Sequence, residues 1–125
     1  PITKIDRLTS GILRFPSGKT STFTCSTQLM PHQRAVIFGD EGKIEVDIPV
    51  NAPPAETTKI TLETKSNKEV FTFDPIDQYM LQGDAFSKAI LENTEVPTPL
   101  NDAVNNMKVI DAIVGSSKKS HWIDL

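Results

Sequence analysis

The stretch Gly39-Asp-Glu-Gly-Lys-Ile-Glu-Val-Asp-Ile48 decides the fold. Its first four residues have the glycine-rich and acidic composition of a turn between two strands. The rest alternates, with Ile44, Val46 and Ile48 on one side and charged residues on the other, so this strand has one buried face. Because the turn is short, the strands that flank it are expected to pair antiparallel; a parallel pair would need a crossover of about a dozen residues or more.

The same kind of short run, rich in β-branched and aromatic residues, recurs up to about Phe73 and predicts further strands. Turn residues such as Pro16-Ser-Gly18 and Ser66-Asn67 separate most of these runs. The exception is residues 49–58, a segment long enough to leave the local hairpin and begin a new edge. The expected strands are residues 8–15, 20–29, 34–38, 43–48, 59–64 and 69–73.

The second expected strand has one side made almost wholly of hydroxyls and amides, from Thr20 to Gln28. Such a face is too polar for a core, yet it carries no charge that would keep partners away. One interpretation is a solvated face of an antiparallel sheet. The other is a face that meets a second subunit or covers a hydrophilic substrate.

Two helices are expected after the strands. Asp74 or Asp77 can cap the first, which runs to about Glu92 and places Tyr79, Gly83, Phe86 and Ile90 on one stripe. Thr98 followed by Pro99 predicts the start of the second helix, which then repeats apolar residues at three- and four-residue steps. Residues 121–125 alternate again and predict one further strand.

Composition bounds the function. The 125 residues, 38% of them apolar, suit one compact domain with a formal charge of −3. This charge gives no footprint for nucleic acid or for an anionic membrane, and no apolar run approaches the ~20 residues of a membrane span. The single Cys25 excludes an internal disulfide and a cysteine-based zinc site. These features favour a reducing, cytoplasmic compartment, and a first residue other than Met, Pro1, suits an excised segment.

The sequence offers little catalytic chemistry. The spacing and setting of Gly39 and Gly42 do not fit a dinucleotide-binding turn, which lies between a strand and a helix. Cys25 is interpreted as a small core residue rather than a nucleophile. The two histidines have no carboxylate at ligand spacing, so no metal site is expected. Asp74 and Asp77 flank a helix start, where carboxylates are stabilising in any case.

The segment Leu29-Met-Pro-His-Gln-Arg34 brings an imidazole, an amide and a guanidinium together just before a strand. Such groups suit hydrogen bonding to hydroxyls or carboxylates, which makes His32 and Arg34 candidate substrate-binding residues. The alternative is a polar connection between strands with an exposed arginine.

Several motifs, in order, resemble the second domain of the Gfo/Idh/MocA family of NAD(P)-dependent oxidoreductases. Gly11-Ile-Leu-Arg-Phe-Pro-Ser-Gly18 is similar to the family's first strand and turn, and residues 37–46 resemble its Gly-x-x-Gly hairpin. Ile48-Pro-Val-Asn-Ala-Pro-Pro54 and the Tyr79 helix resemble the branch that acts on aldoses, including D-xylose and dihydrodiol dehydrogenases. Asp102 to Ser117 and Trp122-Ile-Asp-Leu125 resemble the closing helix and strand.

The resemblance implies an α+β fold: an open, mostly antiparallel sheet of about six strands with two C-terminal helices packed on one face, like the C-terminal domain of dihydrodipicolinate reductase. Residues 1–125 would then be a single substrate and oligomerisation domain that forms a homodimer through its open sheet face. NAD or NADP would bind an N-terminal Rossmann domain outside this chain, and the chain alone would bind neither. The family's acid–base lysine lies in a Glu-Lys-Pro motif that this sequence lacks, so no catalytic residue is carried over.

One cofactor-side residue is implied. The tyrosine that opens the family's Tyr-x-x-Gln helix lies near cofactor and substrate, and it maps onto Tyr79. From the residues alone, Tyr79 could equally be an aromatic that packs on the sheet with its hydroxyl in solvent. The resemblance thus predicts part of a sugar dehydrogenase that is inactive by itself; the alternative is a self-contained binding or oligomerisation module without enzymatic activity.

Overall fold

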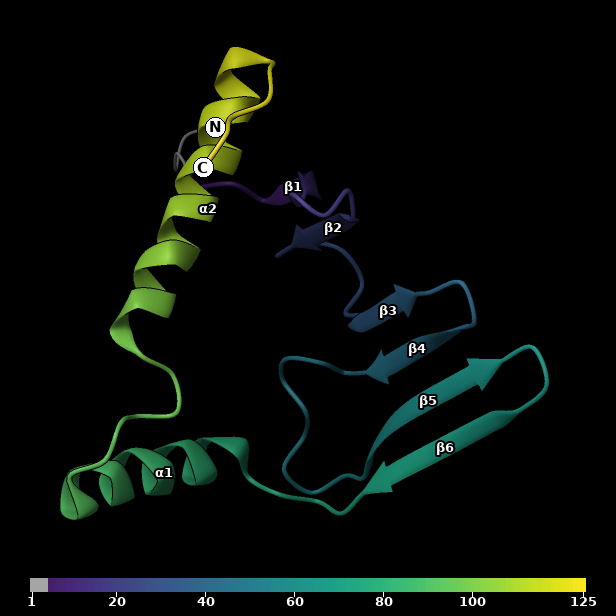
Figure 1. The fold of residues 1–125 in the computed structure, drawn as a ribbon, viewed down its shortest axis with the longest axis vertical. Coiled ribbons are helices and arrows are strands. Elements are labelled where there is room, and N and C mark those ends of the chain that lie inside the picture. Colours follow the sequence, from purple (N-terminus) through teal and green to yellow (C-terminus); the bar gives the residue numbers. More distant parts are fainter. Residues whose placement is uncertain (1–4) are drawn as a thin grey trace. The chain divides into compact units, whose positions relative to one another are not determined.

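The computed structural model describes residues 5–125; Pro1 lies outside the described residues. Strands come first and two helices follow (Figure 1). The chain divides into two compact units, one formed by the residues up to Met30 with Thr98–Leu125, the other by Pro31–Pro97. Every described strand pair is antiparallel, which confirms the predicted α+β class.

The described strands form two sheets, where the sequence predicted one. β1 (Leu8–Arg14) pairs with β2 (Thr20–Ser26), and a second sheet has the order β3-β4-β5-β6. Ser26 explains the break after β2: its hydroxyl donates to the Arg7 carbonyl and accepts from the amides of Gln28 and Leu29. A hydroxyl that bonds nearby backbone in this way competes with a continuing strand ladder. The predicted strand therefore ends at Ser26 rather than Leu29. The strands of the second sheet are β3 (Arg34–Phe38), β4 (Gly42–Asp47), β5 (Thr58–Thr64) and β6 (Lys68–Phe73).

The four-stranded sheet has two chemically distinct faces, which follow from its register. Ile44 lies opposite Ile37 on β3 and Leu62 on β5, while Lys43 lies opposite Phe38 and Glu63. Because side chains alternate along a strand, all residues at matching positions share a face. One face, here the apolar face, includes Ala35, Ile37, Ile44, Val46, Ile60, Leu62, Phe71 and Phe73, together with Thr58, Thr64 and Glu69. The other, the charged face, includes Arg34, Lys43, Glu45, Asp47, Lys59, Glu63 and Lys68, together with Val36, Phe38 and Val70. The predicted alternation of residues 43–48 is therefore confirmed.

In the other unit, an aromatic ring on β2 packs against a glycine on β1. Gly11 lies opposite Phe23, whose ring occupies the space that a side chain at Gly11 would fill. Any larger residue at position 11 would therefore displace the Phe23 ring. The hydroxyl-rich side of β2 is exposed, apart from half-buried Ser26, and it shares its face with the exposed Leu8 and Ile12 of β1.

Helix α1 (Gln78–Glu92) is capped by Asp77, whose carboxylate accepts hydrogen bonds from the amides of Tyr79 and Met80. This settles the choice between Asp74 and Asp77. Helix α2 (Leu100–Lys119) begins after Pro99, which makes no side-chain cap bond, so the Thr98 cap expected from the sequence was wrong. Lys118 and Lys119 lie in the last turn of α2, where cations interact favourably with the helix dipole.

The end of the chain is not a strand among the described residues. The backbone turns at Ser120, which has a positive φ of 55°, and the Ser116 hydroxyl donates to the His121 carbonyl. The Ile123 side chain then lies against Gly115 of α2, and the Arg14 guanidinium lies 4.8 Å from the Trp122 ring centroid. These contacts direct the final residues back along the helix, so the alternation of residues 121–125 was misinterpreted.

Apolar side chains remain widely exposed. Among the described residues only Ala89, on α1, is buried, and it keeps 5% of its surface exposed. The stripe predicted on α1 is open as well, with Phe86 and Ile90 more than half exposed. The packing of the two helices on one sheet face stays a prediction.

Candidate functional site

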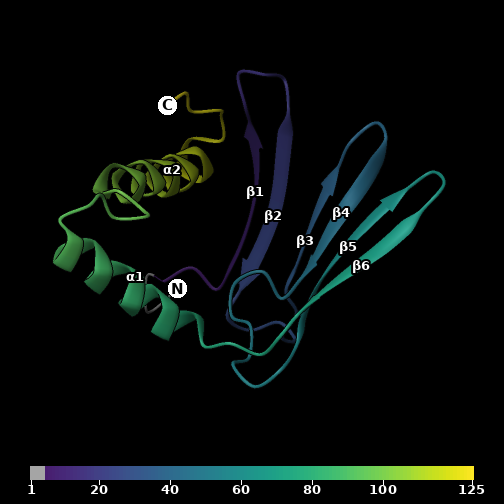
Figure 2. The same ribbon diagram turned by 60° about the horizontal axis from the view of Figure 1, so that its bottom comes forward.

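Three segments of the second unit meet at one end of its sheet (Figure 2). Arg34 at the start of β3 pairs with Asp47 at the end of β4, and Thr58 at the start of β5 pairs with Phe73 at the end of β6. The segment before β3, the connection from β4 to β5 and the link from β6 to α1 therefore lie at this end. We call it the loop end; it is opposite the two tight hairpin turns. All three residues predicted to form a site, His32, Arg34 and Tyr79, lie on these segments or directly beside them.

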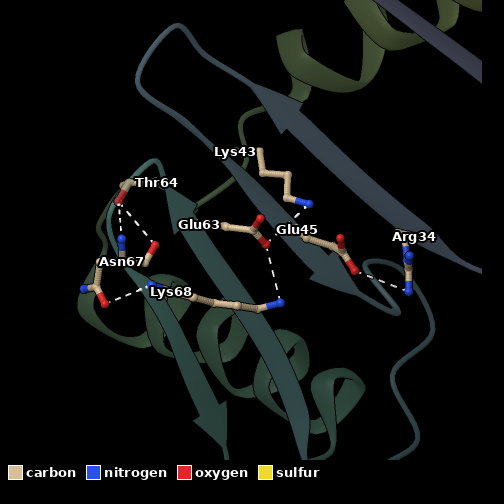
Figure 3. A network of polar contacts seen from close by, with 7 residues as sticks. All are labelled: Arg34, Lys43, Glu45, Glu63, Thr64, Asn67 and Lys68. Atoms are coloured by element: carbon tan, nitrogen blue, oxygen red, sulfur yellow. Dashed lines mark hydrogen bonds and ion pairs between the residues drawn. The ribbon is translucent and has the colours of Figure 1, made fainter.

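Arg34 is engaged by carboxylates of the charged face (Figure 3). Its guanidinium lies 3.3 Å from a Glu45 oxygen and 3.9 Å from an Asp47 oxygen. With about half of its side chain exposed, Arg34 keeps donors available to a ligand, because a guanidinium has five N–H groups. Its first role in the structure is nonetheless to bridge β3 and β4.

His32 and Tyr79 are both exposed, and Tyr79 has 68% of its surface accessible. Within residues 5–125, no hydrogen bond or ion pair joins His32, Arg34 and Tyr79 to one another. The topology therefore brings the three residues to one end of the sheet without forming a direct polar cluster.

The residues that do meet at the loop end are two glutamines beside the predicted ones. The Gln33 Oε1 accepts hydrogen bonds from the amides of Val50 (3.3 Å) and Asn51 (3.2 Å). The Gln78 Nε2 donates to the Val50 carbonyl at 3.0 Å. Both glutamines are half-buried, whereas His32, Arg34 and Tyr79 are exposed. The amide of the His-Gln-Arg segment, rather than its imidazole, therefore makes the contacts to the loop.

The loop that the glutamines hold begins with a strained residue. Ile48 has a φ of 50°, in a region that β-branched side chains rarely adopt, and the following Pro49 further restricts it. Such a conformation costs on the order of 1–3 kcal/mol and persists only where neighbouring contacts enforce it. The hydrogen bonds to Val50 and Asn51 are contacts of this kind, so the loop is fixed by its neighbours rather than by its own preference.

At the opposite end of the sheet, Glu63 lies between two lysines (Figure 3). Its carboxylate is 3.4 Å from the ammonium groups of both Lys43 and Lys68. The charge of Lys43 and the hydrogen bond from Lys68 lower the pKa of Glu63 below 4.5. An open hollow of about 370 Å³ lies beside these residues at the hairpin turns. Lys43 and Glu63 in its lining pair with each other, and Asp40, Glu41 and Lys65 also line it. Because the hollow is wide open and lies at the hairpin turns, away from His32, Arg34 and Tyr79, we do not regard it as the ligand site.

The glycines at residues 39–42 belong to a hairpin turn. The amide of Gly39 donates to the carbonyl of Gly42 across a hairpin turn, and β4 rather than a helix follows. This confirms the interpretation of residues 39–42 as a turn and leaves no amide-lined strand-to-helix junction there for a pyrophosphate.

Other chemistry is limited as well. No group of three or more metal-ligating side chains comes together within residues 5–125. Cys25 is exposed, although the sequence favoured a buried position. Neither helix of the described residues combines the length and the apolar character that crossing a membrane requires.

The contacts of Gln33 and Gln78 with Val50 and Asn51 were not predicted from the sequence. Gln33 lies in the predicted segment, but its neighbours His32 and Arg34 carry the imidazole and the guanidinium that indicated substrate binding. Gln78 had no signal beyond its place after the Asp77 cap. The pairing of β3 with β4 sets residues 48–51 beside Gln33, and only the structure shows that both glutamines bond Val50.

Comparison with known proteins gives a consistent set of matches. The family described as "Oxidoreductase family, C-terminal alpha/beta domain" matches residues 8–125. An uncharacterized oxidoreductase, ORF334, of Rhizobium meliloti is 36% identical over 98% of this chain and 38% of its own length. D-xylose 1-dehydrogenase (NADP(+)) 2 of Haloferax volcanii is 29% identical over 97% of this chain and 37% of its own length. The chain thus spans less than two fifths of these relatives, and no solved structure matches it.

Proposed function

The chain belongs to the oxidoreductase family whose C-terminal alpha/beta domain it matches over residues 8–125, and from this premise we propose its role in a larger enzyme. It forms the substrate-side domain of an NAD(P)-dependent dehydrogenase that oxidises an aldose or a related polyol or diol. The family match over almost the whole chain carries this proposal. The similarity to a D-xylose dehydrogenase that uses NADP supports the sugar and the cofactor class.

In this proposal, NAD or NADP binds a Rossmann domain outside residues 1–125, and this chain alone is inactive. The hairpin setting of Gly39 and Gly42, with β4 rather than a helix after them, supports that division of labour. The loop end supplies the wall of the sugar pocket: His32 and Arg34 offer hydrogen-bond donors to hydroxyl groups, and Tyr79 lies at the cofactor side. Substitution of Tyr79 by Phe in the enzyme then alters the kinetic constants without impairing folding.

The test is to express the complete reading frame that encodes this chain and to assay D-xylose and other aldoses with NAD and NADP. The expected result is aldose-dependent formation of the reduced dinucleotide by the whole protein and none by residues 1–125. If the native reading frame starts near Pro1 and its product oxidises no aldose, the chain is instead a self-contained binding or oligomerisation module.

We further propose that the hydroxyl-rich face of the β1–β2 hairpin forms a homodimer interface. Thr20, Thr22 and Thr24 are exposed on this face, and Leu8 and Ile12 add apolar area that would favour association. Some hydroxyl groups of this face already have a hydrogen-bond partner within the hairpin: those of Ser10 and Thr24 hydrogen-bond each other at 2.8 Å. Apart from Arg14, which lies opposite Thr20 at one end, the face carries hydroxyl and apolar side chains that suit contact with a second copy.

The dimer is tested by substituting Asp at Thr22 and Thr24 and measuring sedimentation. In the dimer, the new carboxylates of the two copies would lie close together across the interface and repel each other. The dissociation constant of the dimer should therefore rise by about tenfold or more. Ser21→Asp, on the other side of the same strand, serves as the control and should leave association unchanged. A parent protein that is monomeric at high concentration would refute the interface.

A further inference from the structure

The amide contacts at the loop end form a continuous link between three segments. Gln33 precedes β3, Val50 and Asn51 follow β4, and Gln78 is the first residue of α1. Val50 lies at the centre: its amide donates to Gln33 and its carbonyl accepts from Gln78. A shift in any one segment would therefore break a contact to another.

The chemistry of each contact fixes which end of each glutamine is used. Both partners of Gln33 are N–H donors, so its side chain acts only as an acceptor there. The partner of Gln78 is a carbonyl, so its side chain acts as a donor. The two glutamines are thus not interchangeable, although both are half-buried and both bond the same residue.

The link bears on the site because of what lies next to it. Gln33 lies between His32 and Arg34, and Gln78 precedes Tyr79. The strained Ile48 shows that the loop is held away from its own preference. An ordered loop between the candidate sugar-binding residues and the candidate cofactor-side residue would keep their separation constant, which is a requirement for a near-attack geometry.

We propose that Gln33 and Gln78 are positioning residues that clamp residues 48–51 and so set the sugar-binding wall relative to Tyr79. This rests on the proposed function for its kinetic consequence, but the clamp itself is a property of the fold. Neither glutamine is assigned a contact with substrate.

The experiment uses the complete enzyme that contains this chain and compares two isosteric Gln→Glu substitutions with one truncation to Ala. Gln33→Glu keeps an acceptor for the two amides and should retain KM for the aldose within about twofold. Gln33→Ala loses both hydrogen bonds to the loop and Gln78→Glu loses one, so each should raise KM about tenfold or more, the scale of one or two lost hydrogen bonds. Affinity for NAD or NADP should stay unchanged in all three. Glu at the start of α1 suits the helix dipole, so Gln78→Glu should not act by weakening the helix.

Asn67→Ala is the matched control. Asn67 also ties a loop with its side-chain amide, accepting from the Lys68 amide and donating to Glu69, but it does so at the hairpin end of the sheet. This variant should keep the KM of the parent. An equal rise in KM for Asn67→Ala, or for Gln33→Glu, would reduce the glutamines to general structural residues and overturn the proposal.

Hydrogen exchange separates the clamp from the proposed function. The amides of Val50 and Asn51 should be protected in the parent and in Gln33→Glu, and should exchange about tenfold faster in Gln33→Ala. A parent that oxidises no aldose refutes the proposed function, whereas fast exchange of these two amides in the parent refutes the clamp.

Discussion

The two faces of the four-stranded sheet differ in whether their side chains find partners within the sheet. On the charged face, Glu63 pairs with Lys43 and Lys68, and Arg34 pairs with Glu45, all within the sheet. On the apolar face, Ile37, Phe71 and Phe73 are each about half exposed or more. The charged side chains of the first face are paired, although Phe38 and Val70 on that face are also exposed. On the second face most side chains are apolar, so leaving them in water is unfavourable in proportion to the exposed apolar area.

This difference indicates which side of the sheet needs a neighbour. An apolar face that extends across four strands exceeds what scattered surface residues account for, and such patches mark interaction sites. For a domain that we propose to be part of a larger enzyme, cover by another part of that enzyme or by a second subunit is expected. The comparison can be tested by substitutions on adjacent residues that point to opposite faces.

The largest effect is expected from Phe71→Asp in the complete enzyme. A carboxylate placed under a covered apolar face lacks partners, so the free energy of unfolding should fall by about 3 kcal/mol. The neighbouring Thr72→Asp points to the charged face opposite Lys59 and should change stability by less than about 0.5 kcal/mol. Urea unfolding of the two variants gives the comparison. Equal, small effects would mean that the apolar face is open in the enzyme.

A smaller effect is expected from acid on the charged face. The pKa of Glu63 is lower in the folded chain than its ordinary 4.5, because of Lys43 and Lys68. Its pairs therefore contribute their full stabilisation above about pH 4.5 and lose it as the pH falls through the lower, folded pKa. Because this carboxylate is partly exposed and screened by solvent, the contribution is small and should weaken further with added salt.

Glu63→Gln tests this directly by thermal unfolding as a function of pH. The variant should be slightly less stable than the parent near neutral pH and should converge with it in acid. Glu56→Gln, which alters no ion pair among the described residues, should follow the parent at every pH. A constant gap between Glu63→Gln and the parent would show that the lysine pairs carry no stability.

The strands were predictable because their alternation is local. Residues 34–38 were placed without error, and the other strand bounds shifted by a few residues at most. The split into two sheets was not predictable. It depends on the Ser26 hydroxyl, which accepts hydrogen bonds from the amides of Gln28 and Leu29 where a longer strand would use them for pairing. The final residues failed for a similar reason: His121 and Ile123 alternate like a strand but follow contacts made by Ser116 and Gly115 of α2.

The site was predictable in place but not in its contacts. Each of His32, Arg34 and Tyr79 was singled out on its own chemistry, and strand pairing then put all three at the loop end. The two glutamines were missed because a neutral amide has no charge or spacing signal, and its importance comes from a backbone partner distant in sequence. Val50 is such a partner for Gln33 and for Gln78.

The central claim is that hydride transfer requires a nucleotide-binding part outside these residues. Titration of NADH and NADPH against residues 1–125, followed by dinucleotide fluorescence, tests it most directly. We predict no saturable binding by this chain up to millimolar dinucleotide, and saturable binding by the complete protein. Micromolar binding by residues 1–125 alone would contradict the account.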